Sequence, residues 1–114
     1  SLLLAVANNI ALLQAENTRI SNAGLKDFSR FTNLVRLNLA GTGINSGGIT
    51  SLLSLTHLEY INLTGTQLDD AGLMQLAGLP ALKKIYAWNT RVTTAGAAAF
   101  RTKKPGIQLQ LGAE

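Results

Sequence analysis

Apolar side chains alternate with polar ones over short stretches of this chain, and the stretches return at a constant spacing. Blocks that align with one another start at Ile10, Leu34, Leu58 and Leu82, so that 34 − 10, 58 − 34 and 82 − 58 each give 24, and a fifth starts at Gly106. Their fourth and sixth positions are apolar: Leu13 and Ala15, Leu37 and Leu39, Ile61 and Leu63, Ile85 and Ala87, and Leu109 and Leu111. Apolar residues two apart, flanked by polar ones, predict a short strand with one buried face.

The second part of each block carries the signals of a turn and then a helix. The ninth position is always threonine, at Thr18, Thr42, Thr66 and Thr90. We expect its hydroxyl group to bond the turning backbone. The twelfth position always holds a residue that is favoured as a helix N-cap: Ser21, Asn45, Asp69 and Thr93. Apolar residues at helical spacing follow at Leu25 and Phe28, Ile49 and Leu52, Leu73 and Leu76, and Ala97 and Phe100.

A glycine follows each expected N-cap by three residues, at Gly24, Gly48, Gly72 and Gly96. Glycine inside a helix costs about 1 kcal/mol relative to alanine, so its recurrence requires a local reason. We expect another backbone to pass too close to these positions for a side chain to fit.

One block of strand, turn and helix cannot bury its apolar faces alone, and neighbouring blocks must cover one another. The chain is therefore predicted to be an α/β protein, a right-handed solenoid with a parallel strand sheet on the concave face and helices on the convex face. The expected full repeats are residues 10–33, 34–57, 58–81 and 82–105. Residues 2–9 match the second half of a repeat, and residues 106–114 supply a terminal strand.

The stretch "RLNLAGTGINSGGI", residues 36–49, also has the order of a phosphate-binding loop, with Gly41, Gly43 and Gly48 between a strand and a helix. The dinucleotide fingerprint would require a third glycine where Ser46 stands, and no Gly-Lys pair is followed by serine or threonine. The repeat accounts for the same glycines, so we interpret the stretch as a solenoid turn.

The segments "LVRLNLAGTGI", "LEYINLTGTQL" and "LKKIYAWNTRV" resemble the leucine-rich repeat family, with threonine where many members have asparagine or cysteine. The resemblance extends over essentially the whole chain and implies a single leucine-rich repeat domain over residues 1–114. It also implies that the concave strand face is the usual binding surface.

A narrower likeness concerns "NLTGTQLDDAGLMQLAGLPALKKIYAWNTRVTTAGAAAF" together with "KKPGIQLQLG". These segments resemble the C-terminal repeat module of bacterial envelope proteins that also carry a c-type cytochrome-like domain. That resemblance implies an extracytoplasmic location, in the periplasm or cell envelope, and a fragment of a larger protein. Because the chain has no Cys-x-x-Cys-His, no redox role is assigned to it.

Composition narrows the functional classes. The 114 residues suit one domain, and 46% of them are hydrophobic, which disfavours a disordered chain. The chain has no cysteine, which excludes disulfides, thiolate metal sites and cysteine nucleophiles. The apolar start "SLLLAVANNIALL" is too short to span a bilayer, so no direct membrane insertion is expected. No cofactor and no metal site are predicted.

Alternate strand residues point away from the core and form the candidate binding face. The predicted partner-binding residues are Arg36, Asn38, Tyr60, Asn62, Lys84, Tyr86 and Trp88. All tyrosines and the tryptophan of the chain fall in this set, a composition that is typical of protein-binding hot spots. Two alternatives stay open, because aromatic residues also favour strands and Trp88 could shield the last repeat.

Basic residues gather near the C-terminus at Lys83, Lys84, Arg91, Arg101, Lys103 and Lys104, in a chain of net charge +4. Nucleic-acid binding would require basic residues along the whole groove, but Glu16 and Glu59 interrupt it. We therefore expect a solvated basic end and no nucleic-acid partner.

Catalysis finds little support in the sequence. His57 is the single histidine and stands in a loop before Leu58. Asp69 and Asp70 form the single carboxylate pair, but the first is an expected N-cap and the second begins a helix, where negative charge suits the dipole. No catalytic residue is predicted, and the chain is not expected to be an enzyme.

The leading hypothesis is a non-enzymatic protein-interaction module that binds a partner or a neighbouring domain of the parent chain through its concave strand face. The alternatives are a carbohydrate-binding module and a purely structural C-terminal cap of a longer envelope protein. Self-association through the cut N-terminal edge is also considered, because Leu2, Leu3 and Leu4 would be exposed there.

The repeat alignment makes a stability prediction. Leu63 is expected to be buried, so Leu63→Ala should lower the free energy of unfolding by about 2–5 kcal/mol. Gln67 stands in a variable column, and Gln67→Ala should cost less than about 0.5 kcal/mol. Urea unfolding of both variants checks the alignment, and equal losses would show that it is wrong.

Overall fold

A computed structural model describes residues 12–14, 17 and 19–112 of the chain. Strands and helices alternate along this part of it. Their order is β1 (Leu12–Gln14), α2 (Asn22–Phe28), β2 (Arg36–Asn38), α3 (Ser46–Ile49), the 3-10 helix η1 (Thr50–Leu52), β3 (Tyr60–Asn62), α4 (Asp70–Leu76), β4 (Lys84–Tyr86), α5 (Thr94–Lys103) and β5 (Gln108–Gln110).

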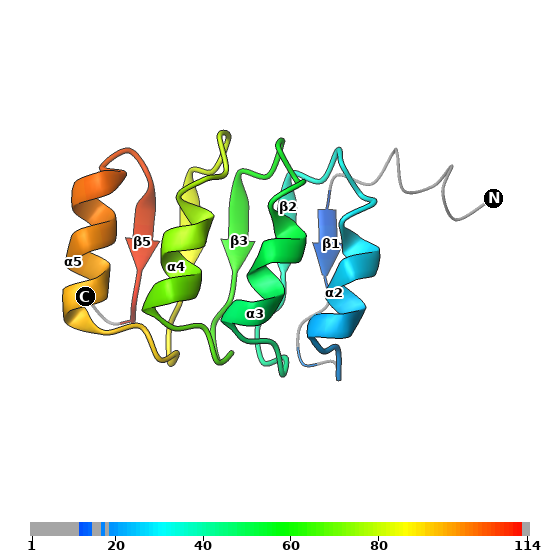
Figure 1. The fold of residues 1–114 in the computed structure, drawn as a ribbon, viewed down its shortest axis with the longest axis horizontal. Helices are drawn as coiled ribbons and strands as arrows, with labels where there is room; N and C mark the ends of the chain where they lie inside the picture. The colour runs from blue at the N-terminus through cyan, green and yellow to red at the C-terminus, as the bar shows by residue number, and fades with distance from the viewer. Residues whose placement is uncertain (1–11, 15–16, 18, 113–114) are drawn as a thin grey trace.

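The five strands form one parallel sheet in the order β1-β2-β3-β4-β5. Each residue pairs with the residue 24 positions later, as Leu37 does with Ile61 (61 − 37) and Ile61 with Ile85 (85 − 61). The helices stand side by side in a layer that covers one side of the sheet (Figure 1). The predicted α/β architecture with a parallel sheet is therefore confirmed.

The core lies between the sheet and the helix layer. Leu37, Leu39, Ile61, Leu63 and Ile85 are buried on the strand side. They pack in one cluster with buried helix residues, among them Leu25, Ile49, Leu52, Leu73, Leu76 and Phe100. Leu63 is fully buried, as the repeat alignment predicts, whereas Gln67 is exposed. The alternation of apolar and polar residues thus identifies which strand face is buried.

The second helix segment is irregular. The α-helix α3 has only four residues, and the chain continues as the 3-10 helix η1. Gly47 and Gly48 occupy half of α3, and glycine is the weakest helix former after proline. Ile49 and Leu52 remain fully buried, so the apolar stripe is kept although the helix type changes.

The repeated threonines act as predicted. The hydroxyl groups of Thr42 and Thr66 donate to the carbonyl oxygens of Leu39 and Leu63, each at 2.7 Å. Thr90 donates to the carbonyl oxygen of Ala87 at 2.9 Å. Each bond closes the turn that follows a strand. Thr18 lies outside the described residues.

The predicted helix caps are present in three repeats. The side chains of Asn45, Asp69 and Thr93 accept from the backbone N–H groups of Gly47, Gly72 and Gly96, at 2.9, 3.2 and 3.0 Å. Ser21 holds the N-cap position of α2 but makes no capping bond with its side chain.

The reason for the recurring glycines differs from the expected one. A Cβ atom at Gly48 would lie 2.4 Å from Oδ1 of Asn22, and one at Gly72 would lie 2.3 Å from Oγ of Ser46. A Cβ at Gly96 would lie 2.1 Å from the carboxylate of Asp70. The space is therefore taken by a side chain of the preceding repeat and not by another backbone, which corrects the expectation.

These side chains tie one repeat to the next. Asn22 accepts from the backbone N–H of Asn45 at 3.1 Å and donates to its side chain at 2.6 Å. Asp70 accepts from the backbone N–H of Thr93 at 2.8 Å and from its hydroxyl group at 2.6 Å.

The middle repeats make the same tie with a serine. Ser46 donates its hydroxyl to Asp69 and accepts from the Asp69 N–H at 3.2 Å. We call this contact of a first helical residue with the next N-cap the cap clamp. Glycine three residues after the N-cap is what leaves room for it.

Gly96→Ala tests the cap clamp. Alanine favours helix, but its methyl group would displace the Asp70 carboxylate, so we expect a loss of about 1–3 kcal/mol in the free energy of unfolding. Nothing lies within 4 Å of a Cβ at Gly106, so Gly106→Ala is the matched control and should be near neutral. Urea unfolding of Gly96→Ala in an Asp70→Ala background completes the cycle. A loss that persists there would contradict the steric explanation.

Asp69 gives the clamp a dependence on pH. The Ser46 hydroxyl and then the Gly72 N–H hold the pKa of Asp69 below its usual value of 3.8. Because the folded-state pKa is lowered, the stabilisation is present above that value and is lost as pH falls through the folded pKa. We expect Asp69→Asn to lose less stability than the wild type between about pH 5 and pH 3. Parallel slopes in unfolding measurements across that range would contradict this role.

Candidate functional site

The outward residues of the strands form two rows on the sheet face opposite the helices, which we call the strand face. In the first row Arg36 pairs with Tyr60, Tyr60 with Lys84, and Lys84 with Gln108. The second row consists of Asn38, Asn62, Tyr86 and Gln110 in the same register. The side chains between the rows point into the core, so the parallel register alone brings residues from three repeats together.

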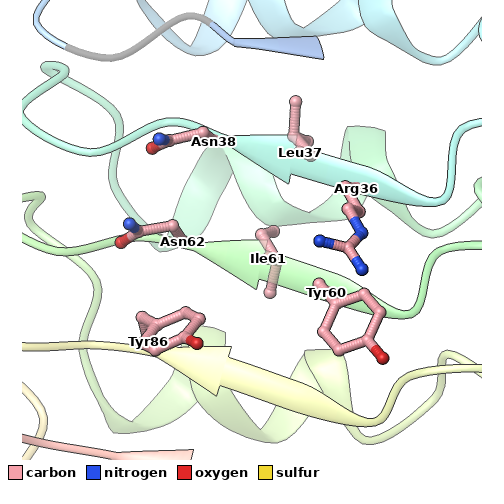
Figure 2. Close-up of a pocket in the computed structure, with 7 residues that line it drawn as sticks. All are labelled: Arg36, Leu37, Asn38, Tyr60, Ile61, Asn62 and Tyr86. Atoms are coloured by element: carbon pink, nitrogen blue, oxygen red, sulfur yellow. The ribbon is translucent and has the colours of Figure 1, made fainter. Parts of the chain in front are cut away.

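A hollow of about 180 Å³ lies on this face. We call it the strand-face hollow. It is lined by Arg36, Leu37, Asn38, Tyr60, Ile61, Asn62 and Tyr86. Figure 2 shows Arg36 and Tyr60 on one side, Asn38 and Asn62 on the other, and Tyr86 on the next strand. Five of the seven predicted binding residues therefore surround one depression.

Two cation–π contacts organise the tyrosines. The guanidinium carbon of Arg36 lies 4.5 Å from the centre of the Tyr60 ring, across the β2–β3 pair. Nζ of Lys84 lies 4.8 Å from the centre of the Tyr86 ring, two residues along β4. Such contacts are worth about 0.5–1 kcal/mol at exposed sites. They place a positive charge against each ring of the strand face.

The two asparagines are partly used by the fold. Oδ1 of Asn38 accepts from the N–H of Ala40 at 3.1 Å, and Oδ1 of Asn62 accepts from the N–H of Thr64 at 3.0 Å. Both side chains thus bond the backbone where the strand ends. For Asn62 this leaves the amide nitrogen as the group that can serve a ligand.

Trp88 lies apart from the strand-face hollow. It follows β4, is 44% exposed, and does not line the depression. Its carbonyl oxygen accepts from the N–H of Gly65 at 2.8 Å, which extends the sheet contact beyond the strands. Lys84 also lies outside the lining and reaches the site through its contact with Tyr86.

Sequence reasoning missed Leu37 and Ile61, which also line the hollow. Both side chains belong to the core cluster, and the period-2 pattern assigns them to the buried face. No signal in the sequence separates a buried strand residue that borders a surface depression from one that does not.

The charges near the hollow are mostly positive. Glu59 bonds Lys83 at 3.1 Å, and this hydrogen bond raises the pKa of Lys83 above 10.5. Among the described residues this is the one ion pair, so Arg36 and Lys84 have no acidic partner there. Glu16, the other expected interruption of the basic character, lies outside the described residues.

The basic C-terminal end is partly structural. Nη2 of Arg101 donates to the carbonyl oxygen of Leu109 at 2.9 Å, so this guanidinium holds the last strand. Arg101 and Lys103 also lie in the last turn of α5, where a positive charge interacts favourably with the helix dipole.

The residues considered for catalysis are separated. Nδ1 of His57 lies 3.1 Å from the carbonyl oxygen of Thr32 on an exposed loop. Asp69 and Asp70 each bond a different cap clamp partner. Within residues 12–14, 17 and 19–112, no three histidine, aspartate or glutamate side chains come together as a metal site would need. The hollow is also smaller than the roughly 300–1,000 Å³ of ligand pockets.

No helix in the described part of the chain is long and apolar enough to cross a membrane. Side chains that could test self-association through Leu2, Leu3 and Leu4 lie outside the described residues.

Comparison with known proteins supports the repeat assignment. A family model described as "Leucine Rich repeat" matches residues 32–53 and 54–77, which supports a leucine-rich repeat family. Repeats of this family are generally non-enzymatic and mediate protein interaction, and nothing in the described residues points to catalysis. No curated protein sequence matches this chain.

The fold is also found among solved structures. A chain in the structure of the Chaetomium Mex67:Mtr2 subunits is 19% identical to this one, with a TM-score of 0.68. The alignment covers 98% of this chain and 87% of that chain. At this level of identity the likeness shows a shared fold.

Proposed function

We propose that this chain is a non-enzymatic interaction module that binds a protein partner, or a neighbouring domain of its parent chain, through the strand face. The observation that carries the proposal is the convergence of Arg36, Tyr60, Asn62 and Tyr86 on one hollow. Tyrosine and arginine are enriched at the centres of protein interfaces, and both residue types meet here.

The strand face is well prepared for binding. Its side chains start from a hydrogen-bonded sheet, and the ring of Tyr60 is further held by Arg36 and that of Tyr86 by Lys84. Side chains that are already ordered lose less entropy when a partner binds, which leaves more of the contact energy for affinity. A rigid aromatic surface therefore suits a binding role.

Carbohydrate binding is less favoured by this geometry. A sugar would stack on an open aromatic face, but Arg36 and Lys84 each lie over a tyrosine ring. Trp88 is exposed without such a contact, yet it lies away from the polar groups of the hollow that would bond sugar hydroxyls. We therefore retain the protein partner as the proposal.

The finer features of the proposal come from the repeat pattern and the sequence resemblance. They are a right-handed solenoid, a concave strand face, an extracytoplasmic location, and a position beside a cytochrome-like domain in a bacterial envelope protein. We also keep no nucleic-acid partner as part of the proposal, because β2 to β5 carry two lysine or arginine residues in all.

The test is co-precipitation from extract of the source cells, followed by affinity measurement with the purified partner. Tyr60→Ala/Tyr86→Ala should weaken binding by about tenfold or more, because aromatic residues at an interface centre dominate affinity. Leu53→Ala is the control, since Leu53 is exposed at the end of η1, in the helix layer.

Trp88→Ala is measured beside these variants, and circular dichroism checks that each one is folded. A loss confined to Trp88→Ala would move the binding surface away from the hollow. Unchanged binding in every folded variant would contradict the proposal and favour a structural cap.

A further inference from the structure

Resting on that proposed function, we infer that the strand-face hollow receives the carboxylate of an aspartate or glutamate in an extended acidic segment of the protein partner. The inference names the chemistry of the partner, which the proposed function leaves open. It is carried by the donors around the hollow, by the local charge, and by the spacing of two cations.

Arg36 supplies the charged donor. Its side chain is exposed at the rim of the hollow, and its contact with the Tyr60 ring uses no N–H···O bond. A guanidinium group presents paired N–H donors that match the two oxygens of a carboxylate. Because the ring holds the guanidinium in place, the fork is already oriented before a ligand arrives.

Neutral donors complete the rim. Asn62 has committed its carbonyl oxygen to the N–H of Thr64, so its amide nitrogen is the polar atom left for a ligand. Tyr86 lies on the neighbouring strand, directly opposite Asn62, and adds a hydroxyl group (Figure 2). Donors therefore outnumber acceptors around the hollow, as an anionic ligand requires.

The charge balance points the same way. No aspartate or glutamate occurs in β2, β3, β4 or β5. Glu59 precedes β3, but its carboxylate is engaged by Lys83. Arg36 and Lys84 thus keep their charges unneutralised by the described residues. An acidic segment would be attracted to this face and a basic one repelled.

The spacing of the two cations suits an extended peptide. Arg36 and Lys84 occupy the same row, two strands apart, which corresponds to about 9.6 Å between strand axes. In a polyproline II segment, residues three apart lie on one face and about 9.3 Å from each other. An acidic residue in the hollow would therefore place another, three positions along, near Lys84.

A library of random peptides of about twelve residues, displayed on phage and selected on the wild-type protein, tests the inference. Counter-selection uses Tyr60→Ala/Tyr86→Ala. We expect enriched peptides to share an aspartate or glutamate, often with a second one three positions along. Synthetic copies with glutamine in place of the shared acid should bind about tenfold more weakly or worse.

Arg36→Gln should weaken the selected peptides by a similar factor, and Arg36→Lys by less, because lysine keeps the charge but lacks the fork. Arg30→Gln is the matched control: it makes the same substitution and charge change at an exposed residue of the turn after α2, and should leave affinity unchanged. Higher salt should weaken wild-type binding.

The outcomes separate the inference from the proposed function. Peptides that need Tyr60 and Tyr86 but share no acidic residue, or that tolerate Arg36→Gln, would overturn the inference and leave the proposed function standing. Failure to enrich any peptide above counter-selection would overturn the extended acidic segment, whereas the co-precipitation decides the proposed function independently.

Discussion

Parallel backbone pairing at a constant offset is the constraint on which the rest of this structure depends. Every strand residue faces the residue 24 positions away, from β1 to β5. The offset is maintained because Leu37, Ile61 and Ile85 must all enter the same core, and a slip by one residue would turn them to solvent. The outward residues inherit this order, and so Arg36, Tyr60 and Lys84 become neighbours although they are far apart in the chain.

The helix starts add a second tie between repeats. Asn22, Ser46 and Asp70 each bond the N-cap residue of the following repeat, which in turn bonds its own first turn. The polar groups at each helix N-terminus are thereby satisfied without water. Local helix capping and contact between repeats are thus one interaction, and the unfavourable glycine in each first turn is a consequence of it.

The strand face combines rigidity with an unbalanced charge. The tyrosine rings are supported by cations, and the nearby Glu59 is occupied by Lys83. An interface built in this way orders few groups on binding and selects partners by charge. This physical combination connects the proposed protein interaction with the inferred acidic segment.

The sequence by itself determined the periodic part of this protein. Strand positions such as Leu63, the turn threonines and the N-caps Asn45, Asp69 and Thr93 recur in register because each repeat must meet the same demands for burial and hydrogen bonding. Only the tertiary structure decided the contacts that are not periodic. It placed Trp88 outside the hollow, gave Arg101 the carbonyl group of Leu109, and filled the space beside Gly96 with Asp70. These contacts depend on the length and direction of side chains from neighbouring repeats, which column patterns do not encode.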